Sequence, residues 1–214
     1  MALRRGFKEA ARRIALDVRA ELGVAVFAPL DPYALAELYG IDIHDLSAPD
    51  LPSAAVEHFT GPAADSFSAA LLSVGTGSVI IENHTHDMVR RRSTIAHEMA
   101  HVLLEHDFGF LLTENQGCRS SASEAESEAA ELSGELLVPR DAARTAAFRG
   151  WTDYSVARYF RVSESMARWR MNTSAARRIA RRWRNNTGNT AETRGQRGTW
   201  LNKRVSSRVT GSWT

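Results

Sequence analysis

Two histidines in the stretch STIAHEMAHVLLEH, residues 93–106, stand four positions apart with a glutamate directly after the first. On an α-helix, residues four apart lie about 40° apart around the axis, so His97 and His101 share one face. Two imidazole nitrogens in that arrangement reach one zinc ion at about 2 Å. Glu98 lies about 100° from His97, where its carboxylate can take a proton from a water activated by the metal. The pattern predicts a zinc site, and the alternative is a buried helix that carries two structural histidines.

A catalytic zinc usually has a third protein ligand, and the segment SASEAESEAAELSGELLVP, residues 121–139, is the best source. If a helix begins at Ser123, Glu126 belongs to a capping box and is tied to the helix start. Glu128 is the carboxylate closest to the predicted apolar seam, so we select Glu128 as the third ligand and keep Glu124 in reserve. The competing acids are Glu124, Glu126, Glu128, Glu131 and Glu135.

Apolar periodicity and turn residues predict the elements that position these side chains. His97 and His101 fall on a predicted helix over residues 88–106. Gly75-Thr76-Gly77 is predicted to join two strands into a hairpin. The other predicted helices cover 5–22, 32–39, 123–137, 141–148, 152–160, 163–171 and 174–184. The predicted strands cover 41–46, 54–59, 67–74 and 78–82, and a loop covers 107–122. The pattern predicts an α+β fold that is mostly helical with a small antiparallel sheet.

Charge is distributed unevenly along the chain. Residues 1–139 hold 10 basic and 21 acidic side chains, a net of −11, whereas residues 140–214 hold 17 and 4, a net of +13, and the sum is the chain's +2. We predict a body over 1–139, a basic helical segment with helix-turn-helix-like punctuation over 140–184, and a disordered tail over 185–214. The basic half predicts weak contact with nucleic acid, and the alternative is that its helices pack on the body.

Composition narrows the class of protein. Cys118 is the single cysteine, so no disulfide forms within the chain, which fits a reducing compartment. The N-terminus lacks the apolar segment of a signal peptide, and no apolar run is long enough to span a bilayer. We therefore expect a cytoplasmic protein with no membrane partner.

Several motifs together resemble the ImmA/IrrE family of metallopeptidases. They are PLDPYALAELYGI, the hairpin ending VIIEN, RRRSTIAHEMAHVLLEH, ESEAAELSGELLVP and VARYFRVSESMARWRM, which extend over about residues 10–170. The resemblance implies a zincin-like metallopeptidase domain that binds Zn²⁺. It implies that His97 and His101 are metal ligands, that Glu98 is the general base, and that Glu128, directly before Ala129, is the glutamate ligand.

The resemblance also implies a function. The expected activity is that of a zinc-dependent endopeptidase whose protein substrate is a helix-turn-helix transcriptional repressor, and cleavage would relieve repression in a stress response or a mobile element. An extended substrate could pair with the strand over 78–82 if that strand is an edge. Candidates for stabilising the oxyanion are His84, His86, His106 and Tyr154. The alternatives are a DNA-binding regulator with a vestigial metal site and a toxin/antitoxin-type protein with a structural one.

Overall fold

The structure is a computed structural model of the 214-residue chain, and it describes residues 3–48, 51–75, 77–106 and 119–186, without the side chains of 119–122. In chain order the elements are α1 (Phe7–Glu21), α2 (Pro32–Leu38), β1 (Asp42–Asp45), α3 (Ser53–Thr60), η1 (Ala64–Ser66), β2 (Ala69–Val74), β3 (Gly77–Glu82), α4 (Met88–Leu103), α5 (Arg119–Leu137), α6 (Arg140–Phe148), α7 (Asp153–Phe160) and α8 (Glu164–Thr173). A last helix covers 176–186. The predicted α+β, mostly helical fold class is confirmed.

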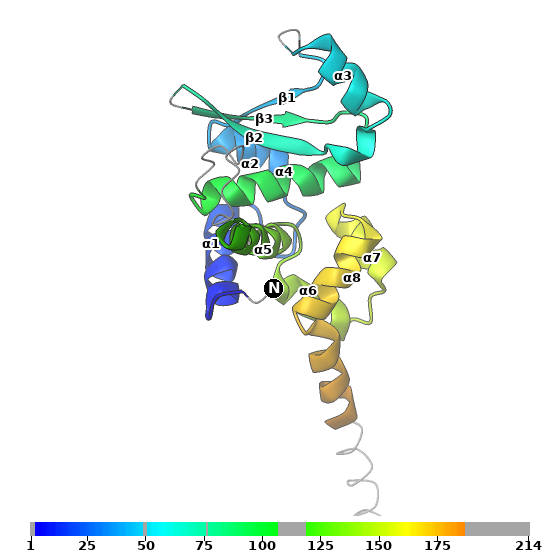
Figure 1. Cartoon of the computed structure of the whole chain (residues 1–214). Coiled ribbons are helices and arrows are strands. Elements are labelled where there is room, and N and C mark those ends of the chain that lie inside the picture. Colours follow the sequence, from blue (N-terminus) through cyan, green and yellow to red (C-terminus); the bar gives the residue numbers. More distant parts are fainter. Residues whose placement is uncertain (1–2, 49–50, 76, 107–118, 187–214) are drawn as a thin grey trace, which may run out of the picture.

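The sheet has the strand order β1-β3-β2. β2 pairs with β3 in the antiparallel sense, as the predicted hairpin requires, whereas β1 pairs with β3 in the parallel sense, so the sheet is mixed. The expectation that the strand over 78–82 could be an edge is wrong, because β3 is hydrogen-bonded on both sides. Within the described residues, β2 is instead the edge strand next to α4 (Figure 1).

One predicted strand is a helix. Residues 54–59, predicted as β from their apolar positions, belong to α3, which begins after Pro52 and ends before Gly61. Ala54, Ala55 and Glu57 are good helix formers, and a proline with fixed φ suits the start of a helix. None of the α3 side chains is fully buried, so no sheet core acts on this segment to override its helical propensity.

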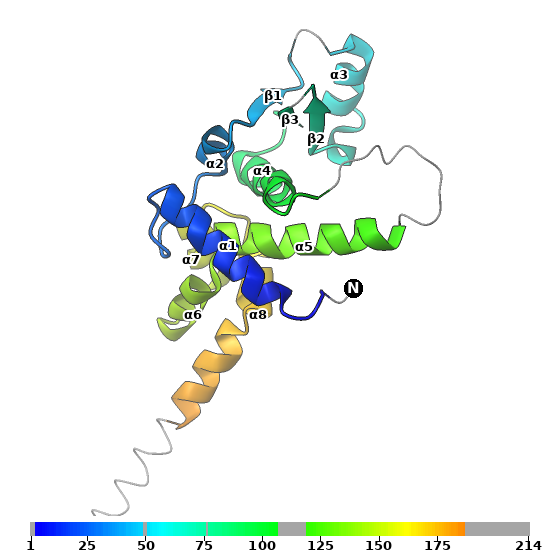
Figure 2. The same cartoon turned by 90° about the vertical axis from the view of Figure 1, so that its left-hand side faces the viewer.

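The helix α4 is the centre of the molecule. It lies between the sheet and α5, and α1 crosses α5 on one side (Figures 1 and 2). Asp87 caps its start by accepting a hydrogen bond from the backbone N–H of Arg90. Ile95 and Met99 are fully buried between the layers, and burying each such side chain stabilises the fold by about 1.5–3 kcal/mol. These contacts fix the rotation of α4 and thereby the direction of its histidines.

The helix α8 packs closely on α5. A Cβ atom added at Gly134 would lie 2.7 Å from the Trp169 ring, so only glycine permits this approach. Arg170 is fully buried and pairs with Glu131 at 2.9 Å and with Glu135. Its Nε also donates to the backbone oxygen of residue 138 at 2.8 Å. The basic segment is therefore joined to the helix that supplies the acidic side chains of the site.

The turn between α7 and α8 is joined to α4 as well. Arg161 ends α7 with a φ of 55°, a position where glycine is favoured, and Ser163 caps α8. The buried Arg92 of α4 donates to the Arg161 carbonyl at 3.3 Å and to the Leu30 carbonyl at 2.5 Å. The helix-turn-helix-like punctuation is confirmed as two helices and a tight turn, whereas the boundaries predicted at residues 139 and 184 remain a prediction.

Some expectations lie outside the described residues. These are the predicted loop over 107–118, including Cys118, and the predicted disordered tail from 187 onward; residues 185–186 belong to the last helix. Within the part of the chain that the structure describes, no helix combines the length and the apolar character needed to cross a bilayer.

Candidate metal centre

The two predicted histidine ligands come together on α4. The Nε2 atoms of His97 and His101 are 3.2 Å apart, and the rings meet edge to face. His101 is buried, and this burial, together with the neighbouring His97, lowers its pKa to about 4. A histidine with that pKa is neutral at physiological pH, which is the state that binds a metal.

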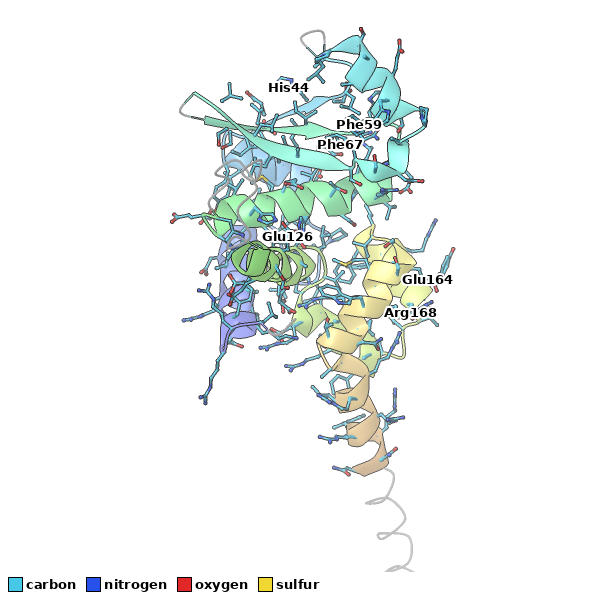
Figure 3. The ribbon with its side chains drawn as sticks, in the orientation of Figure 1. His44, Phe59, Phe67, Glu126, Glu164 and Arg168 are labelled. Carbon is cyan, nitrogen blue, oxygen red and sulfur yellow. The ribbon has the colours of Figure 1, made fainter. Side chains whose placement is uncertain are left out.

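The carboxylate that joins them is that of Glu126, on the side of α5 that faces α4 (Figure 3). Its Oε2 lies 3.1 Å from Nε2 of His97, and its Oε1 lies 3.3 Å from Nε2 of His101. Ligand atoms about 2.0–2.1 Å from a tetrahedral zinc are separated from one another by about 3.3 Å. The two imidazole nitrogens have this separation, and each lies at about the same distance from one of the two oxygens of Glu126. The three side chains can therefore surround one zinc ion, and their chemistry fits the metal.

The structure does not bring Glu128, the ligand selected from the sequence, to the histidine pair. Residues two apart on a helix differ by about 200°, so Glu126 and Glu128 face nearly opposite sides of α5. Glu128 is buried and forms an ion pair with Arg4, whose Nε lies 2.6 Å from Oε1 of Glu128. Glu124, kept in reserve, is exposed.

The capping-box interpretation of Glu126 is wrong. α5 begins at Arg119, so Ser123 is an internal residue and Glu126 lies about two turns into the helix. The letters Ser123 to Glu126 are typical of a helix start, and a sequence gives no sign that the helix has already begun upstream. Glu126 is identified by its closeness to His97 in space. That closeness depends on how α4 and α5 pack, which the sequence does not give.

A third histidine supports the pair from behind. Nδ1 of His106 lies 2.9 Å from Nδ1 of His101, and Nε2 of His106 lies 3.6 Å from Oε2 of Glu128. If Nε2 of His101 holds a metal, its proton is on Nδ1 and is donated to His106. That arrangement fixes the tautomer and the ring orientation of the ligand, as outer partners of metal-binding histidines do. Glu128 therefore contacts the site through His106.

The predicted general base lies beside this cluster. Burial, helped by the neighbouring carboxylate of Glu126 and opposed by a hydrogen bond from the backbone N–H of Leu71, raises the pKa of Glu98 to about 7. A carboxylate whose pKa lies near neutrality is suited to accept and return a proton. Because the Leu71 N–H is given to Glu98, it points away from β3, and the free edge of β2 faces the base.

An open groove of about 540 Å³ runs past His97 and Glu98. One wall is the start of β2, at Ser68 and Ala69, and the opposite wall is the start of α8, at Ser163 and Ser165. A chain that binds along this groove would touch both the sheet edge and the helix-turn-helix-like segment.

The remaining histidine and tyrosine candidates lie elsewhere. His86 contacts the carbonyl of Ala64 at 2.9 Å, and His84 lies 3.9 Å from Asp45, so both belong to the region around β1 and η1. Tyr154 is an exposed residue of α7. The structure does not join these three side chains to the cluster, and the oxyanion donor stays unassigned.

The sequence was compared with known families and proteins. The family model described as Peptidase_M78, IrrE N-terminal-like domain, matches residues 36–172, which is more than half of the chain. The match covers α4, α5 and all but the last residue of α8, and it includes every residue placed in the cluster and in the walls of the groove. No curated protein matches the chain.

Proposed function

Because the chain belongs to the ImmA/IrrE family of metallopeptidases, we propose that it is a zinc-dependent endopeptidase that cleaves a helix-turn-helix transcriptional repressor. The observation that carries the proposal is the cluster of His97, His101 and Glu126, with Glu98 beside it on an open groove. The two Nε2 atoms lie 3.2 Å apart, and each lies 3.1–3.3 Å from one of the two oxygens of Glu126. Family membership supports a peptidase, and the geometry supports a metal-dependent one.

Zinc is the metal that this set of donors fits best. Two imidazoles and one carboxylate are the ligands of several catalytic zinc sites, and three protein ligands leave a position for substrate or water. When bound, zinc would act as a Lewis acid that polarises the scissile carbonyl and makes an attacking water more acidic.

The protein's own groups perform the proton transfers. Glu98 accepts a proton from the attacking water while the water oxygen adds to the carbonyl carbon. Glu98 then returns that proton to the amine nitrogen as the C–N bond breaks. The Leu71 N–H holds the carboxylate of Glu98 in place. Apart from the Leu71 N–H, the backbone groups of β2 that point away from β3 can pair with an extended substrate segment by β-addition.

The repressor is proposed as substrate because of the family resemblance. Cleavage would relieve repression in a stress response or in a mobile element. The open groove supports a protein substrate rather than a small one, because the start of a strand and the start of a helix line its two sides. The alternative is a regulatory protein, DNA-binding or toxin/antitoxin-like, in which the same cluster is vestigial or holds a structural zinc.

Co-expression with repressors encoded nearby tests the proposal. The wild-type chain is expected to produce a truncated repressor, and Glu98→Gln is expected to lower the cleavage rate by about a hundred- to ten-thousandfold while zinc content stays unchanged. Glu37→Gln, which makes the same change at an exposed site on α2, is the control and should cleave normally. Stoichiometric zinc without cleavage of any repressor would favour the regulatory alternative, and full cleavage by Glu98→Gln would refute the mechanism.

A further inference from the structure

The peptidase mechanism leaves the positive charge of the C-terminal half unused. Residues 140–214 hold 16 arginines and one lysine against four acids. The structure divides the described arginines into two groups by their partners, and the division indicates which of them are available to a polyanion.

The arginines of α8 already have partners. Arg168 pairs with Asp153 and with Glu164, each at 3.4 Å, and Figure 3 shows Glu164 and Arg168 together on the outer side of the helix. Arg170 is buried between Glu131 and Glu135. The helix that would read bases in a helix-turn-helix protein therefore presents little free positive charge.

The helix over residues 176–186, called the arm here, is different. It follows α8 and extends away from the body (Figures 1 and 2). Arg178, Arg181 and Arg182 are exposed, and within the described residues none of the three has an ion pair. Arg177, by contrast, pairs with Asp153.

An open hollow of about 600 Å³ lies along the arm. Arginines line it from the arm, and residues near Gly150 and Trp151 line it from α6 and the connection that follows. Among the described residues, no side chain in its lining carries a negative charge. The four arginines on the hollow are Arg177, Arg178, Arg181 and Arg184.

We propose that the arm binds the phosphate backbone of double-stranded nucleic acid without regard to its sequence. Arginines three or four positions apart on a helix are about 4.5–6 Å apart along the axis, which lets neighbouring guanidinium groups meet successive anionic groups of a polyanion. The planar guanidinium, used here almost to the exclusion of lysine, can hold a phosphate through two hydrogen bonds. Phosphate contacts position a protein on a duplex but carry no base information.

The acidic body of a second copy of this chain is the alternative partner for the arm. The described residues favour it less than nucleic acid. Some of the body's exposed carboxylates, such as Glu9 and Asp65, already pair with arginines of their own chain. A duplex presents an uninterrupted row of charges with no such competition.

The test uses the full-length protein and fluorescent duplexes of two unrelated sequences, titrated between about 50 and 200 mM salt. Wild type is expected to bind both duplexes with the same dissociation constant, about 1–100 µM near physiological salt, and to lose affinity steeply as salt rises. Arg178→Ala combined with Arg181→Ala should lower the magnitude of the log–log salt slope by about 1.8 and weaken binding by at least about tenfold. Glu98→Gln should bind like wild type, which separates this activity from the peptidase.

Two variants control for net charge and for folding. Arg158→Ala combined with Arg168→Ala removes the same charge from α7 and α8 and should leave binding unchanged, whereas Arg178→Lys combined with Arg181→Lys keeps the charge and should retain the salt slope. Salt-insensitive or absent binding by wild type would overturn the proposal. Loss of duplex binding in the α7–α8 variant alone would also overturn it. The same holds if the arm variant changes self-association but not duplex binding.

Discussion

At the scale of single residues, the site depends on which acid of α5 faces α4. Glu126 and Glu128 are both within reach of a histidine, but their histidines differ: Glu126 meets His97 and His101, and Glu128 meets His106. The imidazole of His101 therefore has two sets of neighbours. Its Nε2 faces His97 and Glu126, and its Nδ1 faces His106, which in turn contacts Glu128.

The supporting layer has a measurable effect. His106→Ala removes the partner of His101 Nδ1 without removing any group of the direct cluster, so zinc affinity should fall by about ten- to a hundredfold. His106→Gln keeps a hydrogen-bonding group near the same position and should recover part of the loss. Competition with a chromophoric chelator measures both constants, and unchanged affinity in His106→Ala would show that the 2.9 Å contact does not orient the ligand.

Sequence reasoning predicted His97, Glu98 and His101 because their spacing acts within one helix. It did not predict Glu126, because the facing side of α5 depends on where the helix begins and how it packs. Ser123 and Glu126 mimic a helix start, and only the upstream turns from Arg119 show that they lie inside it.

At the scale of elements, buried and exposed arginines of α8 differ in what they stabilise. Arg170→Ala leaves Glu131 and Glu135 buried without their partner and should lower the free energy of unfolding by about 3–5 kcal/mol. Arg168→Ala breaks only exposed ion pairs and should change it by less than about 1 kcal/mol. Urea denaturation measures both, and equal effects would contradict the structural role of Arg170.

Most elements were predictable because their signals are local. Asp31 and Pro32 begin α2, and β2 and β3 pair as the hairpin predicted from Gly75 and Gly77 requires. α3 was mistaken for a strand because residues 54–59 form a short run with apolar positions, and the missing information was that no sheet is available to cover them. The parallel pairing of β1 with β3 is likewise a long-range choice that neither strand's sequence specifies.

At the scale of the whole molecule, the groove is built from both charge halves of the chain. α4 and β2 come from the acidic body, whereas Ser163 and Ser165 come from the basic segment. The uneven charge was visible in the sequence, but the sequence did not show that part of the basic segment forms a wall of the site and that the arm extends from it.

This shared groove predicts a substrate effect that is independent of metal binding. Ser165→Trp should fill part of the groove and lower kcat/KM for an extended peptide by at least about tenfold, with zinc affinity unchanged. Arg158→Trp adds the same bulk at an exposed position of α7 and should have no effect. Equal activity in both variants would show that substrate does not pass the start of α8.

The most direct test of the account is the zinc affinity of Glu126→Gln beside that of Glu128→Gln, measured by chelator competition. If His97, His101 and Glu126 hold the metal, Glu126→Gln should lose more than about a hundredfold in affinity, and Glu128→Gln should lose at most the ten- to hundredfold typical of an outer partner. The reverse order, with Glu126→Gln binding zinc like wild type, would contradict the site described here.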